Sequence, residues 1–303
     1  MSDTQAQTGA NGDGPSDVNR RADGDAVRVG RRRTPWPLVV VALLFVIVPS
    51  LTWYLTWFGR SLTDEELTRY LSDSNPRHAQ HALSQLAERI EKGDASATRW
   101  NAQVVALSQS ATPDLRMTAA WVMGLEHKSE EFRASLARLL EDPEPIVRRN
   151  AALALVRFGD ARSRSELLAM LRPYAVKSAS DGTALTALTE GTRVKRGSLL
   201  IKYKDRSGEL EEVRSPLPGE IARANVKDGG SFEAGRDLFV LAPDAEQARD
   251  ALLGLYFIGG AEDLAEVERY ANGVEGAPED LKAKAAQVAE AIKRRSEGKA
   301  EGR

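Results

Sequence analysis

Two histidines are the side chains of this 303-residue chain whose type and spacing come nearest to a metal site. His78 and His81 lie three residues apart on one expected helix, so they could share a metal ion. No acidic residue or third histidine stands at ligand spacing, and we interpret both as surface residues with no metal bound. The chain has no cysteine, which excludes disulfides and thiolate chemistry.

Acidic pairs and short motifs supply no catalytic set either. We interpret Asp64-Glu65-Glu66 and Glu211-Glu212 as solvated faces rather than as an acid and a base. The chain contains no G-x-S-x-G, no phosphate-binding glycine loop and no zinc signature. The formal net charge of -2 gives no bulk affinity for nucleic acid. We therefore expect a protein that is not an enzyme and binds no cofactor.

The element that would place the rest of the chain is an uncharged apolar stretch from Trp36 to Phe58. At about 1.5 Å of rise per residue, a helix of this length crosses the ~30 Å hydrocarbon core of a bilayer. It is longer than the apolar core of a cleaved signal peptide, so a retained anchor is expected. Four arginines precede it, which predicts a cytoplasmic N-terminus and extracytoplasmic C-terminal domains in a bacterial inner membrane: Arg28, Arg31, Arg32 and Arg33.

Helical periodicity follows, and part of it repeats. The segment LRMTAAWVMGL at 115–125 aligns with VRRNAALALVR at 147–157, 32 residues later, and ARDALLGLYFIGG fits the same template 100 residues after the second copy. Small alanines recur where two helices approach closely. One helix pair cannot bury its own apolar face, so the pairs are expected to stack. Trp100 and Trp121 fall on the apolar stripes and are expected in the core.

The segment from Asp142 to Asp160 resembles the HEAT-like repeat family, in the branch that also contains phycobilisome-lyase repeats. The likeness rests on the Asp142-Pro143 turn, the Val147-Arg148 pair, the small-residue stripe and the final Gly159-Asp160. It implies a solenoid whose broad faces bind other proteins. Arg148 and Arg149 are expected to bond to neighbouring helix ends and acidic residues rather than to a ligand.

Between 175 and 243 the helical period gives way to short strands. The segments 189–201 and 227–239 match each other, with glycines at identical places. Glycines placed in this way predict two identical turns with positive φ, and hence a quasi-two-fold β sandwich.

This module resembles the biotinyl/lipoyl-like family through Ser215-Pro216-Leu217-Pro218-Gly219 and the turn from Val226 to Gly235. In carrier domains of that family a hairpin lysine receives the prosthetic group. Gly208 occupies the expected position here, and Lys204 near the tip is the remaining candidate. The unmodified module resembles that of membrane-fusion (periplasmic adaptor) proteins.

These features together predict an α+β protein in six parts. They are a disordered cytoplasmic arm (1–34), a single N-terminal transmembrane helix (35–59), HEAT-like helical repeats (60–174), a small barrel-sandwich-hybrid β domain (175–243), further HEAT-like helices (244–295) and a disordered tail (296–303).

The first functional hypothesis is a membrane-anchored, non-catalytic scaffold or adaptor that binds partner proteins, in an envelope export or assembly complex. The alternative is a carrier or enzyme-associated subunit with a modified Lys204. A chromophore lyase is a third hypothesis from the repeat family, although an anchor and a β insert are foreign to that pattern.

Overall fold

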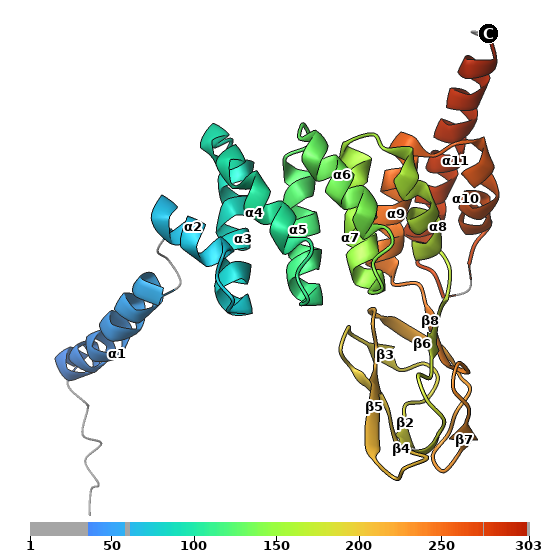
Figure 1. The fold of residues 1–303 in the computed structure, drawn as a ribbon, viewed down its shortest axis with the longest axis horizontal. Helices are drawn as coiled ribbons and strands as arrows, with labels where there is room; N and C mark the ends of the chain where they lie inside the picture. Colours follow the sequence, from blue (N-terminus) through green and yellow to red (C-terminus); the bar gives the residue numbers. More distant parts are fainter. Residues whose placement is uncertain (1–35, 58–60, 275, 302–303) are drawn as a thin grey trace, which may run out of the picture. The chain divides into compact units, whose positions relative to one another are not determined.

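The computed structural model describes residues 36–57, 61–274 and 276–301. The chain divides into two units, Met1–Arg60 and Ser61–Arg303. The described part of the first unit is helix α1 (Trp36–Trp57), shown in Figure 1. The expected disordered arm (1–34) lies outside the described residues.

The prediction of a transmembrane helix over 35–59 is wrong. In the described ranges, no helix combines the length and the apolar character that a membrane crossing requires. The single-pass inner-membrane localisation, with its cytoplasmic N-terminus, depends on that helix and is wrong with it.

The second unit is a stack of helices with an inserted β module (Figure 1). The helices are α2 (Asp64–Leu71), α3 (Pro76–Glu91), α4 (Asn101–Leu107), α5 (Pro113–Leu125), α6 (Glu130–Leu139), α7 (Pro145–Arg157), α8 (Arg164–Met170), α9 (Ala245–Ile258), α10 (Leu264–Ala271) and α11 (Glu279–Glu301), with short 3-10 turns at Ala95–Trp100, Ala161–Ser163 and Ala261–Asp263. Helix α11 continues to Glu301, where the sequence predicts a disordered tail from 296.

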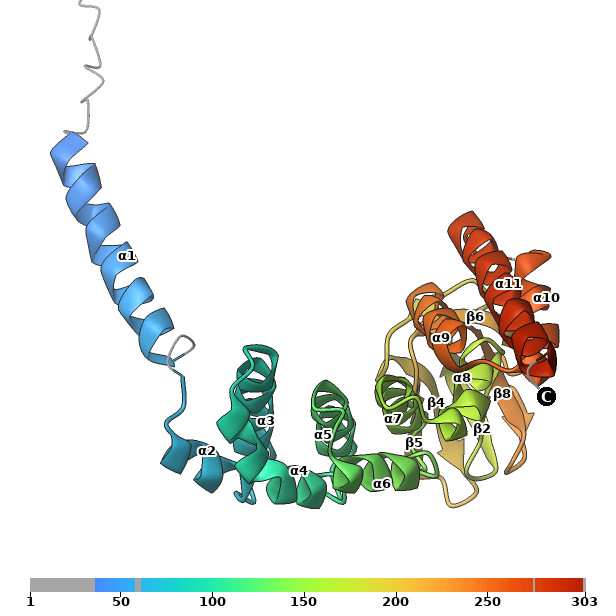
Figure 2. The same cartoon turned by 90° about the horizontal axis from the view of Figure 1, so that it is seen from above.

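The stack has two layers, which Figure 2 shows from above. Helices α3, α5, α7, α9 and α11 pack on one another in one layer, and α4, α6, α8 and α10 form the other. Three helices of the α3–α5–α7–α9–α11 layer begin with a proline: Pro76, Pro113 and Pro145. At this position the missing N–H breaks no hydrogen bond within the helix. The repeated alanines are completely buried, as their spacing predicts: Ala119, Ala120, Ala151, Ala152 and Ala251.

Gly124 marks the closest approach of α5 and α7. A Cβ added there would lie 2.8 Å from the Cβ of Ala154 and 3.0 Å from its Cα. Both atoms are fixed to the α7 backbone, so a side chain at 124 must push the helices apart. We expect Gly124→Val to lower the free energy of unfolding by about 1–3 kcal/mol in a urea titration. Ala134→Val, on the exposed face of α6, is the control, and an equal effect of both would contradict the tight crossing.

The inserted module is two antiparallel four-stranded sheets, ordered β1-β8-β6-β3 and β5-β4-β2-β7. The strands are β1 (Tyr174–Lys177), β2 (Gly182–Ala187), β3 (Arg193–Val194), β4 (Leu199–Asp205), β5 (Leu210–Arg214), β6 (Gly219–Ala224), β7 (Ser231–Phe232) and β8 (Asp237–Ala242). The expected barrel-sandwich hybrid is corrected on this point, because no closed barrel forms among the described strands. Strands β3 and β7, at one edge of each sheet, are two residues long and join no strand of the other sheet.

The two halves of the module repeat the same turns, as the sequence predicts. Gly191 and Gly229 have φ of 79° and 75°, and Gly197 and Gly235 have φ of 81° and 79°. The amide of Gly197 donates to the carbonyl of Ser215 at 2.7 Å, and the amide of Gly235 donates to that of Ser178 at 2.8 Å. The matching bonds confirm an internal quasi-two-fold repeat around one apolar core.

Candidate functional site

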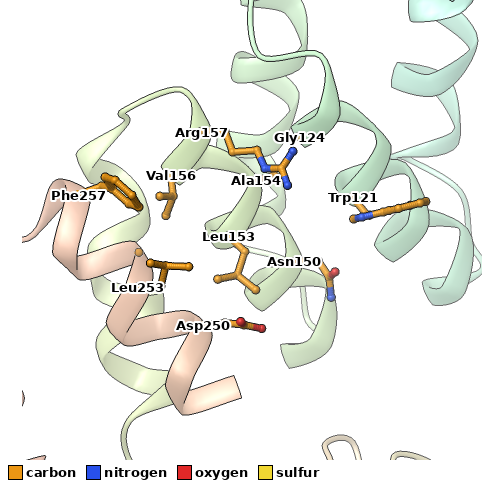
Figure 3. Close-up of a pocket in the computed structure, with 11 residues that line it drawn as sticks. Trp121, Gly124, Asn150, Leu153, Ala154, Val156, Arg157, Asp250, Leu253 and Phe257 are labelled. Atoms are coloured by element: carbon orange, nitrogen blue, oxygen red, sulfur yellow. The ribbon is translucent and has the colours of Figure 1, made fainter. Parts of the chain in front are cut away.

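A hollow of about 350 Å³ opens between α5, α7 and α9 (Figure 3). Apolar side chains and close-approach glycines make up most of its wall, with three polar side chains among them: Trp121, Gly124, Asn150, Leu153, Ala154, Val156, Arg157, Asp250, Leu253, Gly254 and Phe257. We call this hollow the α5–α7–α9 groove.

The groove is built from equivalent positions of three repeats. Trp121, Leu153 and Leu253 are separated by the same 32 and 100 residues that relate the repeats themselves. Trp121 and Leu253 are each 43% exposed, although their neighbours Ala120 and Leu252 are completely buried. Phe257, one turn after Leu253, is 60% exposed. The repeat therefore places Trp121 and Leu253 outside the core and Leu153, which is partly buried, at its edge, in a row across three helices.

Helix α9 forms part of the groove because it packs on α7 and α8, although the β module separates it from them in sequence. Its residues Leu252 and Leu255 share one apolar core with Ala152 of α7 and Leu167 of α8. Gly254 lies close to both helices, since a Cβ there would be 2.9 Å from Leu167 Cδ1 and 3.0 Å from Val156 Cγ2. Segments about one hundred residues apart thus form a single wall.

Two of the polar side chains, Asn150 and Asp250, lie toward one end of the groove, below Arg157 in Figure 3. Asn150 Nδ2 donates to the carbonyl of Ile146 at 2.9 Å, which leaves its Oδ1 as an acceptor. Within the described ranges, Asp250 makes no hydrogen bond or ion pair. Burial raises the pKa of the Asp250 carboxyl, and the nearby Glu246 raises it further.

Residues 101–180 match the HEAT repeats family. No curated protein sequence matches the chain. A similar solved structure is described as a single-chain, multi-domain long-chain acyl-CoA carboxylase. It is 19% identical, with a TM-score of 0.23, and the match covers 37% of this chain and 10% of that one. A likeness at this level carries no argument about fold or function.

The HEAT match covers α4 to α8 and the first strand of the module. It ends before α9, whose repeat begins only after the β insertion. The HEAT-like prediction is therefore confirmed over 101–180. The biotinyl/lipoyl-like and adaptor resemblances are not confirmed and stay predictions.

A buried cluster of charged and polar side chains joins α7, α8 and α9 at the point where the β module is inserted. Arg149 of α7 is 4% exposed, and its Nη1 donates to Gln247 of α9. Its Nε lies 4.0 Å from Glu166 Oε1 of α8 and has no hydrogen-bond partner. Burial raises the pKa of Glu166 and lowers that of Arg149. This cluster connects α7, α8 and α9.

The neighbouring Arg148 also serves the repeat. It donates to the carbonyl of Asp142 at 2.7 Å and to Glu166 at 3.2 Å. These partners are a helix-connecting turn and an acidic side chain of the next helix. The pair Arg148–Arg149 therefore bonds within the stack, as the sequence predicts.

The other residues considered from sequence are scattered. His78 bonds to Asp73 at 2.6 Å and stacks on Tyr70, while His81 lines a separate open hollow between α3 and α5. No group of three metal-ligand side chains occurs within 61–274 and 276–301 or in the described part of α1. Lys204 lies exposed on β4, paired in register with Leu210.

Both acidic runs considered from sequence, 64–66 and 211–212, contain a residue that forms ion pairs. Asp64 accepts from Arg89 and Arg99, both at 2.6 Å. Glu212 pairs with Lys202 and Arg214. None of these groups lies in the groove, and the expectation that the chain is not an enzyme stays a prediction.

Sequence reasoning missed Trp121. It predicts burial for Trp100 and Trp121, which is right for Trp100 at 1% exposed and wrong for Trp121. The repeat alignment carried the missing signal. It places Trp121 one position after the completely buried Ala120, on the edge of the buried stripe, with Leu153 and Leu253 at the same place.

Proposed function

We propose that this chain is a non-catalytic scaffold that binds a partner protein in the α5–α7–α9 groove. The observation that carries the proposal is the row formed by Trp121, Leu153 and Leu253, continued by Phe257. An apolar patch that stays exposed on a folded protein marks an interaction surface, because covering it releases water at no cost in core packing. Solenoid repeats present such surfaces along the layer that faces a partner.

The β module supports the same role as a second surface. Leu185 and Leu210 are 42% and 68% exposed on it. The resemblance of the module to the unmodified one in adaptor proteins supports an adaptor that carries two contact surfaces. Partner binding by the helices and by the module would then be separable.

Site-specific photo-crosslinking tests the groove in cells that express the protein. A benzoyl-phenylalanine at position 253 should crosslink to one partner protein, whereas the same residue at position 134, on the exposed face of α6, should not. The partner, identified by mass spectrometry and purified, should bind Leu253→Ser about 10- to 30-fold more weakly than the unmodified chain.

The matched control is Leu185→Ser, which removes an equally exposed leucine from the β module. It should leave the affinity at the groove unchanged. Identical crosslinks from positions 253 and 134, or equal affinities for both serine variants, would remove the groove as the binding site.

A further inference from the structure

The groove presents acceptors without a donor at its polar end, and this predicts the chemistry of its occupant. We propose that the bound segment is an amphipathic helix with a lysine or arginine one turn from its apolar anchor, and that this cation pairs with Asp250 and Asn150. The inference rests on the proposed function and specifies the partner's recognition chemistry.

The carboxylate of Asp250 is available because its neighbours are already engaged. Asp244 caps α9 by accepting from the amides of Glu246 and Gln247, each at 3.1 Å. Arg249 turns away to pair with Asp280 at 2.6 Å. Asp250 lies in the second turn of α9, beyond the first turn in which the helix dipole favours acidic residues.

Asn150 stands opposite on α7, at the equivalent position of its repeat. Its amide hydrogen bonds to its own helix, so its oxygen is left for an incoming donor. An ammonium or guanidinium group brings several donors and a positive charge, which match one carboxylate and one amide oxygen.

The distance from this polar end to the apolar row sets the spacing in the partner. Leu153 and Leu253 follow Asn150 and Asp250 by three residues, which is about 4.5 Å along a helix. Side chains three or four apart on a partner helix span the same distance. The groove walls are helices whose backbone groups are already paired, so a segment with internal backbone bonds fits better than an extended strand.

The opposite end of the groove is basic. Arg157 closes the upper end in Figure 3 and makes no hydrogen bond or ion pair with any described residue. Arg295 of α11 donates to the backbone carbonyls of Tyr256, at 2.7 Å, and of Phe257, which lines the groove. A bound helix whose cation precedes its apolar anchor and pairs with Asp250 would direct its negative C-terminal end toward Arg157.

Three fluorescein-labelled, alanine-based peptides of about 16 residues test the inference against the full chain by anisotropy. The first carries a lysine one turn before two leucines, the second replaces that lysine by glutamate, and the third keeps the lysine and replaces the leucines by serine. We expect the lysine–leucine peptide to bind at least about tenfold more tightly than either of the others at low salt.

Variants of the chain assign the preference to Asp250. Asp250→Asn should bring the affinities of the lysine and glutamate peptides to within about threefold, and Asp250→Lys should invert their order. Glu131→Asn, an exposed acid on α6, is the control and should leave the preference intact.

Equal binding of the lysine and glutamate peptides would overturn the inference. If Leu253→Ser still weakened both, the groove would stand as a binding site. Binding of the serine peptide as tightly as the lysine–leucine peptide would show attraction by charge alone and would also overturn it. So would no binding of any peptide at about 1 mM, in which case the crosslinking at position 253 decides the proposed function independently.

Discussion

Asp142→Ala should lower the free energy of unfolding by about 3–5 kcal/mol, because it leaves a largely buried arginine without its partner. Asp142 and Arg116 are 5% and 13% exposed and form two parallel hydrogen bonds, at 2.7 Å and 2.8 Å. The same carboxylate accepts from the amide of Glu144 at 2.9 Å. It therefore connects α5 to the turn before α7. Urea unfolding at pH 7 measures the loss.

The pH dependence of this variant has a defined sign. Burial raises the pKa of Asp142, but the hydrogen bonds and charge of Arg116 outweigh it and hold the pKa below 3.8. The contribution of Asp142 is therefore complete above about pH 4 and is lost as the pH falls below that value. The difference in the free energy of unfolding between Asp142→Ala and the unmodified chain should therefore become smaller in acid.

The control for Asp142→Ala is Glu88→Ala. Glu88 pairs with Lys92 at 2.6 Å, but both side chains are more than half exposed. A surface pair of this kind contributes about 0.5 kcal/mol or less. If the two alanine variants unfolded at the same urea concentration, the buried pair would not hold the repeats together.

Trp100→Ala should also lower the free energy of unfolding by about 3–5 kcal/mol, and we expect the loss of stability to be concentrated in the first repeats. Trp100 is 1% exposed, and its indole N–H donates to Thr68 Oγ1 at 2.8 Å. Its removal leaves a cavity among α2, α3 and α4, and Thr68 Oγ1 loses its donor while it still donates to the carbonyl of Asp64. Repeats contact mainly their neighbours, so the damage should stay local.

Hydrogen exchange monitored by mass spectrometry measures this locality. Amides of 64–107 should lose protection in Trp100→Ala, whereas those of α9 to α11 should keep it. Trp121→Ala is a matched control, because removing this exposed tryptophan should lower the free energy of unfolding by about 1 kcal/mol or less. Loss of protection as far as α11 would show that the stack unfolds as one cooperative unit.

The features that sequence predicts correctly are those encoded within a short segment. The helix pairs follow from periodicity, and the module's turns follow from Gly191, Gly197, Gly229 and Gly235, which adopt the positive φ that their spacing requires. The burial of Ala119 and Ala151 follows from the repeat alignment. In each case the deciding interactions lie within one repeat or one turn.

The features that sequence misses depend on distant segments. The groove needs α9 beside α7, and the residues that join them are separated by the whole β module. The barrel prediction is wrong because strand pattern does not reveal that β3 and β7 are too short to close the sheets. The membrane prediction relied on composition alone, and no helix in the described ranges meets both the length and the apolar character that a crossing requires.

The two ends of the β module lie side by side. Strand β1 pairs antiparallel with β8, so Tyr174 stands opposite Leu241. The chain therefore leaves α8 and returns to α9 at adjacent positions. An insertion whose two ends are adjacent can be accommodated within a connection between two helices. Such a cassette can be gained, lost or exchanged while the helical framework keeps its register, so the two parts are free to diversify separately.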